Sequence, residues 1–322
     1  MAILPSIDNL EVTIIVGDQG AKEYDAPDDE NPVDSMTPDD FDLALSQGRT
    51  IPYNLEYIEA KPGVGYIFQV TLGRSFIPRC HHIAWSAESD GNMIKLTHFD
   101  DTHRQQDGSM RRQVGGILDG NPREGYKILN YCFEPVTVVE EDNLNPSELR
   151  EQVDKAKHCG TLKVYLYRMN RGDKYSRDGT EHNNSHIKPP KELPEKALKG
   201  RSIGCVAGTT PGLKRDAGFS YASNYADIRR RPFAIFEFRY RSKKGLVAEG
   251  IIPRPTVLDE VEEMSDGEVR RRLAELLERD QKNVPNPGVK REAPPMDDSE
   301  FSARYKTRKL SNGRLEIDLT DD

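Results

Sequence analysis

Apolar residues recur at every second position in several stretches of the first 250 residues, and this period of two constrains the fold most. Val12, Ile14 and Val16 show it near the N-terminus, and Tyr66 and Phe68 show it again further along. Successive side chains of a strand point to opposite faces, so this pattern predicts strands that bury one face. The body of the chain is therefore expected to be built mainly from β-strands.

Turn residues separate these stretches. SDGN (89–92), QDGS (106–109) and LDGNP (118–122) combine aspartate, glycine and proline, which favour tight turns. Short strands joined by tight turns favour antiparallel pairing, so we predict a mainly β, antiparallel, sandwich-like body with a few short helices. The remaining strong candidates are strands in 126–142, 161–170 and 230–242 and a helix over 146–158.

The composition limits the number of domains and the classes of partner. With 322 residues and 35% hydrophobic content, the chain can bury one core of about 200 to 250 residues, which predicts a β domain over 1–255 followed by a tail. A net charge of -8 makes nucleic-acid binding by the whole surface unfavourable. No apolar run approaches the roughly 18 residues of a membrane span, and no secretory signal begins the chain, so no membrane partner is expected.

The four cysteines, Cys80, Cys132, Cys159 and Cys205, occur singly. Without a CxxC pair they predict reduced thiols in an intracellular protein rather than a disulfide framework.

The character of the chain changes after residue 255. Ser265 and Glu268 have the spacing of a capping box, and Val269 and Leu273 begin an apolar stripe that Leu276 and Leu277 continue. We predict a linker and an amphipathic helix over 256–282, which either docks or frays as a surface helix or binds a partner. From residue 283 to 322, proline and charge with few apolar residues predict a disordered tail.

Three stretches together resemble a known family. They are MAILPSIDNLEVTIIVG (1–17) with KEYDAP (22–27), LPEKALKGRSIG (193–204), and RRPFAIFEFRYRSKKGLVAEGIIPRP (230–255). In this order they resemble an uncharacterised fungal family, domain of unknown function 7918, over roughly residues 1–255. The resemblance implies a fungal intracellular protein with a mainly β body and assigns no catalytic residue. An acid-rich insert (28–45) and a His-rich insert (178–190) depart from the pattern and are predicted to be loops.

Two loops carry residue types that bind metals or catalyse reactions. CHHIAW (80–85) contains thiol and imidazole groups, but no second pair follows at zinc spacing, so strand residues are the better interpretation. HFDDTH (98–103) could form a hydrolytic cluster, although the ends of hairpins collect the same residues. An enzyme working from loops 80–82 and 98–103 is kept as an alternative; no catalytic residue, metal ligand or cofactor is assigned.

Two glycine-rich segments imitate catalytic motifs. GRSIG (200–204) copies a nucleophile elbow around Ser202, but a helix is expected before it, so it is interpreted as a helix end. GCVAGTTPGLK (204–214) lacks the order of a phosphate-binding loop and is predicted to be a flexible loop.

Basic residues concentrate in 229–244. A patch of these arginines and lysines with Tyr240 would bind nucleic acid through phosphate contacts and stacking. The alternative places Arg239 and Arg241 on the solvent face of an edge strand, where they protect the edge against aggregation. Edge protection is favoured, and nucleic acid is an unlikely partner.

Short motifs in the tail give the most specific hypothesis. VKRE makes Lys290 a candidate acceptor of the small modifier SUMO, and the candidate nuclear localisation signal consists of Lys290, Arg291, Lys306, Arg308 and Lys309. LEIDLTDD resembles a SUMO-interacting motif, with Leu315, Ile317, Asp318, Leu319 and Thr320 as candidate partner-binding residues. Its aliphatic side chains at period two would enter a groove while the backbone adds a strand to the partner. The usual pattern has two adjacent aliphatics, and Glu316 occupies one of those places.

These motifs lead to one functional hypothesis. We expect a non-enzymatic binding or scaffold protein, nuclear rather than cytoplasmic, whose tail binds SUMO or SUMO-modified proteins. The alternative for the tail is a solvated terminus with no partner.

Overall fold

A computed structural model describes most of the body and short pieces of the C-terminal part. In the body it covers residues 2–27, 51–77, 80, 82–94, 96–139, 146–176, 190, 192–198, 200–216, 218–227 and 230–254. In the C-terminal part it covers residues 267, 270–272, 274–275, 306–309 and 315–318. By its internal contacts the chain separates into two units, Met1–Arg254 and Pro255–Asp322.

The first sheet of the body is formed by the N-terminal strands and two later ones. Its order is β1 (Ala2–Ile3), β2 (Leu10–Val16), β6 (Tyr66–Leu72), β10 (Met110–Val114), and β3 (Gln19–Gly20) also pairs with β2. All of these pairs are antiparallel. The period-two prediction is confirmed here, because Val12, Ile14 and Phe68 are fully buried on one face.

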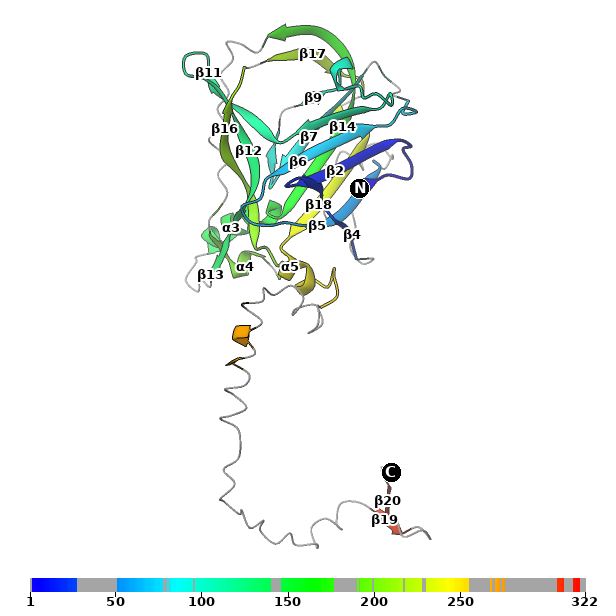
Figure 1. The fold of residues 1–322 in the computed structure, drawn as a ribbon, viewed down its shortest axis with the longest axis vertical. Helices are drawn as coiled ribbons and strands as arrows, with labels where there is room; N and C mark the ends of the chain where they lie inside the picture. The colour runs from blue at the N-terminus through cyan, green and yellow to red at the C-terminus, as the bar shows by residue number, and fades with distance from the viewer. Residues whose placement is uncertain are drawn as a thin grey trace. The chain divides into compact units, whose positions relative to one another are not determined.

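The second sheet is the larger one. Its order is β4 (Glu23–Asp25), β5 (Tyr53–Glu59), β18 (Ala234–Arg241), β14 (Thr161–Ser176), β7 (His82–Ser89), β8 (Asn92–Met93); β17 (Phe219–Tyr225) pairs with β14, and β9 (Thr97–His98) pairs with β7. Only β5 and β18 pair in parallel within this sheet as described. Figure 1 shows it as a layer facing the sheet of β2 and β6.

A third sheet and a short parallel pair complete the body. β12 (Gly125–Pro135) lies between β11 (Gly116–Asn121) and β16 (Cys205–Lys214), and β13 (Thr137–Val139) pairs with β15 (Glu192–Pro194). The helices α3 (Pro146–His158), α4 (Glu195–Leu198) and α5 (Lys243–Ala248) gather at one end of the body, opposite β9, β11 and β17 (Figure 1). The predicted mainly β, antiparallel-rich fold is confirmed, as is the helix over 146–158.

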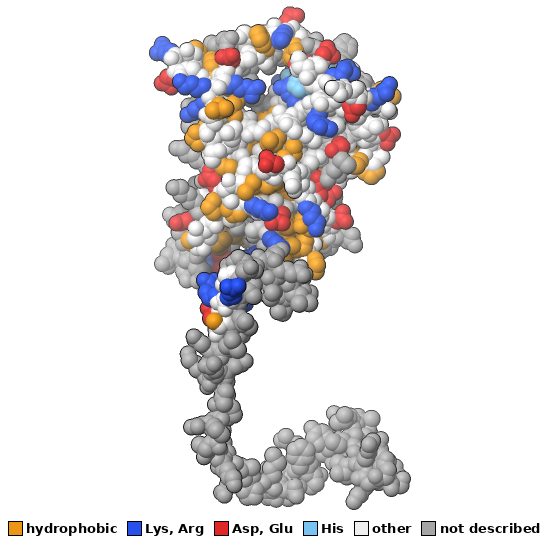
Figure 2. Space-filling view, viewed as in Figure 1, with side chains coloured by type: hydrophobic (Ala, Val, Ile, Leu, Met, Phe, Trp, Pro, Cys, Tyr) orange, Lys and Arg blue, Asp and Glu red, His pale blue; other side chains and the backbone are white. Residues whose placement is uncertain are grey.

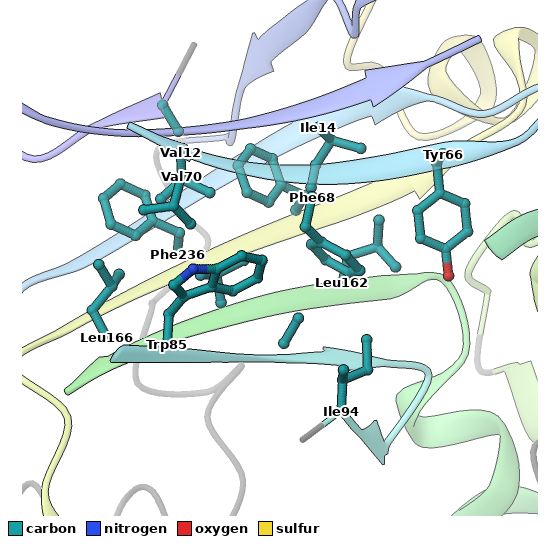
Figure 3. Packing of buried hydrophobic residues seen from close by; sticks show 14 of the residues in the cluster. Val12, Ile14, Tyr66, Phe68, Val70, Trp85, Ile94, Leu162, Leu166 and Phe236 are labelled. Atoms are coloured by element: carbon teal, nitrogen blue, oxygen red, sulfur yellow. The ribbon is translucent and has the colours of Figure 1, made fainter. Parts of the chain in front are cut away.

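The main core lies between the first two sheets. Figure 3 shows Val12, Ile14 and Phe68 pointing toward Trp85, Leu162 and Phe236 of the facing layer. Trp85 is 1% exposed and Phe236 is 0% exposed. Each such burial contributes about 1.5 to 3 kcal/mol to folding, so this contact between sheets is the main stabilising element of the body.

Two local predictions are wrong. The segment 204–214, predicted as a flexible loop, is largely strand β16, which pairs along β12 from Cys205 opposite Pro135 to Lys214 opposite Lys127. Its apolar residues Cys205, Val206 and Ala207 are buried, and these contacts outweigh the turn preference of its glycines. The turn predicted at 118–122 comes later, because β11 continues to Asn121, whose side chain accepts hydrogen bonds from the backbone of Arg123 and Glu124.

The C-terminal unit is described only in pieces. The described residues 267, 270–272 and 274–275 of the predicted amphipathic helix are helical, whereas Val269, Leu273, Leu276 and Leu277 of its stripe lie outside the described residues. Strand β19 (Lys306–Lys309) pairs antiparallel with β20 (Leu315–Asp318). Most of the tail predicted to be disordered, residues 283–305 included, lies outside the described residues.

Candidate functional site

A cleft of about 660 Å³ is the principal candidate site of the body. The start of β6, the link from β10 to β11, the middle of β12 and the segment between β16 and β17 line it. Its volume falls in the range typical of small-molecule sites. No single sequence motif marks the cleft, because six separate parts of the chain form it, among them Gly17 with Asp18, and Thr97.

Glycines allow the chain to pass closely from the first sheet to the third beside this cleft. A Cβ at Gly115 would lie 2.9 Å from Cγ1 of Ile67, and a Cβ at Gly116 would lie 2.5 Å from the carbonyl oxygen of Leu129. Larger residues would push β10 and β11 away from their neighbours. The lining of the cleft therefore depends on a backbone approach that only glycine permits.

Arg112 supplies a half-buried positive charge to the cleft. It lies on β10 opposite Val70, and its guanidinium donates a hydrogen bond to the carbonyl oxygen of His98. Burial lowers the pKa of Arg112, the nearby Asp100 raises it, and the charge of Arg215, which also lines the cleft, lowers it further. Sequence reasoning did not single out Arg112, because an arginine in a strand is more often a solvated residue.

The two loops of the enzyme hypothesis meet at a pair of histidines. Strand β9 pairs with β7, which places Nε2 of His82 3.0 Å from Nδ1 of His98. Both residues are buried, at 9% and 7% exposed. One ring must accept the hydrogen bond that the other donates, so the accepting ring has no proton at that nitrogen. His81 lies outside the described residues.

Cys80 does not contribute an activated nucleophile to this pair. Its thiol donates a hydrogen bond to the backbone carbonyl of His82, with Sγ 3.2 Å from the oxygen. Burial raises the pKa of the Cys80 thiol, whereas a nucleophilic cysteine needs a lowered pKa.

The acidic loop 98–103 forms a short 3-10 turn, η1 (Asp101–His103). The side chain of Asp100 accepts a hydrogen bond from the backbone N–H of Thr102 at 3.0 Å, and the backbone N–H of Asp100 donates to Nδ1 of His103 at 3.2 Å. These contacts form a capping box that satisfies the start of the turn. The residues act as a hairpin end, which was one of the two interpretations of this loop.

Asp90 is a buried carboxylate that joins several strands. The SDGN stretch forms the predicted turn, with positive φ at Asp90 (47°) and Gly91 (79°). The Asp90 side chain accepts hydrogen bonds from the hydroxyl of Tyr240 at 2.6 Å and from the backbone N–H groups of Ala207 at 2.7 Å and Thr161 at 3.1 Å. One turn residue therefore links β7, β14, β16 and β18.

Burial raises the pKa of Asp90 to about 6, although these hydrogen bonds oppose the shift. The ionisable groups that face it are Tyr240, Cys159, Cys205 and Tyr66, all of which are neutral at pH 7 because burial raises their pKa values. The Asp90 carboxylate is thus buried mainly among neutral groups, and its ionisation is costly.

The raised pKa predicts how stability depends on pH. The folded chain keeps the Asp90 proton up to about pH 6, whereas the unfolded chain loses it near 3.8. This group therefore stabilises the fold most at low pH, and about 2 to 3 kcal/mol of that stability is lost as the pH rises from 4 to 7. Urea unfolding measures the free energy of unfolding of the natural chain and of Asp90→Asn. The stability of the natural chain relative to Asp90→Asn should fall by this amount as the pH rises from 4 to 7. A constant difference between pH 4 and 7 would contradict the shift.

The GRSIG segment is a structural junction. The guanidinium of Arg201 donates to the carbonyl oxygens of Ala156, Lys157 and Cys159, which end the last turn of α3. Such contacts satisfy carbonyls that a helix end leaves without partners. The backbone N–H of Ser202 donates to Oε1 of Glu249 at 2.6 Å. Ser202 therefore lies at a packed junction, and no elbow between strand and helix is formed.

The edge-strand interpretation of 229–244 is wrong. Strand β18 pairs with β5 on one side and with β14 on the other, so both of its edges are covered. Arg241 is 2% exposed and donates from Nε to Oε1 of Glu249 at 2.7 Å. Arg239 lies beside Glu237, with Nε 3.2 Å from Oε1. These arginines form ion pairs within the body, and Figure 2 shows Lys and Arg interspersed with Asp and Glu on the visible face.

The tail candidates fall partly within the described residues. Lys306, Arg308 and Lys309 of the nuclear signal lie in β19, and Leu315, Ile317 and Asp318 of the SUMO-interacting motif lie in β20. Lys290, Arg291, Leu319 and Thr320 lie outside the described residues, as do Arg229 and the His-rich segment around His182 and His186.

The described part of the chain contains no metal cluster, no disulfide and no membrane-spanning helix. Over the described part of the chain, no group of three or more His, Cys, Asp or Glu side chains is placed to hold a metal ion. None of the four cysteines forms a disulfide. No described helix is long and apolar enough to span a membrane.

Comparison with known proteins gives one match. A family model described as "Domain of unknown function (DUF7918)" matches residues 9–255. No curated protein and no solved structure matches the chain. The matched region ends within one residue of the boundary between the two structural units.

Proposed function

Because the chain belongs to the DUF7918 family, whose description assigns no activity, we propose a function from its own tail residues. The chain is a non-enzymatic binding or scaffold protein whose C-terminal segment, residues 315–320, binds SUMO or a SUMO-modified protein. The observation that supports this proposal is the extended backbone of strand β20. An extended segment has the conformation needed to add a strand to the sheet of a partner.

The pairing of β20 leaves room for such an addition. Among the described residues β20 pairs with β19, with Leu315 opposite Lys309 and Ile317 opposite Thr307. A strand has two edges, and a hairpin uses only one of them. Alternate residues of β20 then direct their backbone N–H and C=O groups toward the other edge, which is the surface that a partner strand requires.

The sequence of β20 supplies both an apolar row and a negative charge. Leu315 and Ile317 stand at period two in β20, the spacing that places alternate residues of a strand on one face, and Leu319 continues the spacing in the sequence. Glu316 and Asp318 alternate with them, and two further aspartates end the chain. A partner groove with an apolar floor and a basic rim is complementary to this pattern.

Nuclear localisation is part of the same proposal. The basic residues Lys306, Arg308 and Lys309 lie in β19, directly opposite the acidic and apolar residues of β20. Lys290 in VKRE is the proposed acceptor of SUMO on this chain. The nuclear signal and the SUMO acceptor both rest on sequence patterns. Imaging of the tagged chain with Lys306, Arg308 and Lys309 replaced by alanine tests the nuclear signal.

The binding test uses the full chain and purified isotope-labelled SUMO. We expect Ile317→Asp to weaken binding about 30-fold, because an isoleucine that leaves a groove loses about 2 kcal/mol of burial. Deleting residues 314–322 should abolish binding. The matched control is Glu316→Gln, which keeps the apolar row and should weaken binding only about two- to threefold through the lost charge. NMR titration of SUMO measures all three variants, and equal affinity of Ile317→Asp and the natural chain would refute the proposal.

A further inference from the structure

The cleft described above has the features of a ligand site. It measures about 660 Å³ and lies within the body, in the part of the chain that the DUF7918 family model covers. An inference about this cleft is independent of the tail motifs, because the described residues that line it all belong to the body.

Two guanidinium groups in the cleft form no ion pair with any carboxylate that the structure describes. Among the described residues, neither Arg112 nor Arg215 forms an ion pair, and the side chain of Arg112 makes one hydrogen bond, to the carbonyl oxygen of His98. Arg112 retains most of its five N–H donors for another acceptor. Its charge is half-buried, whereas Asp18 and Asp216 at the cleft are exposed and screened by water. The least solvated charge of the cleft is therefore positive.

An exposed aromatic ring completes the arrangement. Phe219 lines the cleft, is 65% exposed, and has Nζ of Lys174 4.5 Å from the centre of its ring. Its ring offers a surface on which a flat group can stack.

We propose that this cleft binds a small organic anion that carries a planar ring. Arg112 and Arg215 bind the oxygens of its carboxylate or phosphate group, and the ring stacks on Phe219. Guanidinium groups suit this role because their planar donors match both oxyanions, and charge-assisted hydrogen bonds are the stronger ones.

Calorimetric titration of the full chain with four probes tests the proposal. Phenyl phosphate and benzoate carry both a ring and an oxyanion and distinguish the phosphate from the carboxylate source. Inorganic phosphate lacks the ring, and phenol lacks the charge. We expect at least one of the two ring anions to bind at least tenfold more tightly than inorganic phosphate and phenol, with affinity that falls as salt is added.

Variants on one strand separate the cleft from general surface charge. Arg112→Gln should weaken binding of the preferred ring anion about tenfold or more. Arg111→Gln, its exposed neighbour outside the cleft lining, removes the same charge and should change binding less than twofold. Arg215→Gln, at an exposed position with no ion pair among the described residues, should also weaken binding without lowering the unfolding temperature.

Three results would overturn the proposal. The first is that neither ring anion binds at millimolar concentration. The second is that phenol binds as well as the ring anions. The third is that Arg111→Gln weakens binding as much as Arg215→Gln does. Loss of SUMO binding by the tail would leave all of these measurements unchanged, so the two proposals fail separately.

Discussion

Asp90→Ala is expected to lower the free energy of unfolding by about 3 kcal/mol or more at pH 5, because it leaves three buried donors without their acceptor. The donors are the hydroxyl of Tyr240 and the backbone N–H groups of Ala207 and Thr161. Alanine also tolerates the positive φ of 47° at this position less well than aspartate does. At pH 5 the carboxyl of Asp90 in the folded chain is mostly protonated. Its removal therefore relieves little of the cost of burying a charge, and the loss of the hydrogen bonds dominates.

Asp90→Asn is the matched control for this substitution. Asparagine keeps one oxygen acceptor, has nearly the same volume and accepts the left-handed conformation. Its amide would face the N–H of Ala207 or that of Thr161, and two donors cannot bond to each other, so a smaller loss of about 1 to 2 kcal/mol is expected. Urea unfolding at pH 5 gives both values. If alanine and asparagine destabilise the chain equally, the hydrogen-bond network is not what stabilises this turn.

The sequence predicted the position of Asp90 but not its role. The pair of aspartate and glycine between two strand candidates predicts a tight turn, and the positive φ values of Asp90 and Gly91 confirm it. Aspartates in such turns usually face water, and nothing in the local sequence shows that Thr161 and Ala207 lie beside this one. Those contacts come from residues 71 and 117 positions away, and local pattern carries no information at that separation.

The same limit explains why β16 was predicted as a loop and why β18, correctly predicted as a strand, was expected at a sheet edge. Glycine and proline in 204–214 have weak strand preference, and arginine in 229–244 is usually exposed to solvent. Pairing with β12 stabilises the first strand, and burial of Arg241 with Glu249 satisfies the second. Alternation of apolar residues predicted β2 and β6 correctly, because their core contacts require only one buried face.

The candidate cleft could not be predicted for a related reason. Arg112, Tyr131 and Arg215 come from β10, β12 and the segment after β16, and no pair of them is close in the sequence. Each tail motif, by contrast, is a short contiguous segment that can be recognised in the sequence alone. Sequence reasoning therefore favoured the short tail motifs over a site that depends on the folded body.

The buried ion pair of Arg241 and Glu249 provides the second large prediction. Glu249→Ala should destabilise the chain by about 3 to 5 kcal/mol, because it leaves the 2% exposed guanidinium without its carboxylate and the N–H of Ser202 without its acceptor. The double variant Arg241→Met with Glu249→Leu should recover a large part of this loss, since it removes both charges. Together with the natural chain, Arg241→Met, Glu249→Leu and the double variant form a thermodynamic cycle, and unfolding measurements should give a coupling energy of about 2 kcal/mol or more.

The control for this pair lies on the same strand. Arg239 is two residues away, its side chain is 19% exposed, and the buried Glu237 that it contacts also has Nζ of Lys163 3.4 Å away. Removing Arg239 leaves Glu237 with that second cation, so Arg239→Met should cost only about 1 kcal/mol. A cost for Glu249→Ala no greater than that for Arg239→Met would contradict the stabilising role of the buried Arg241–Glu249 pair.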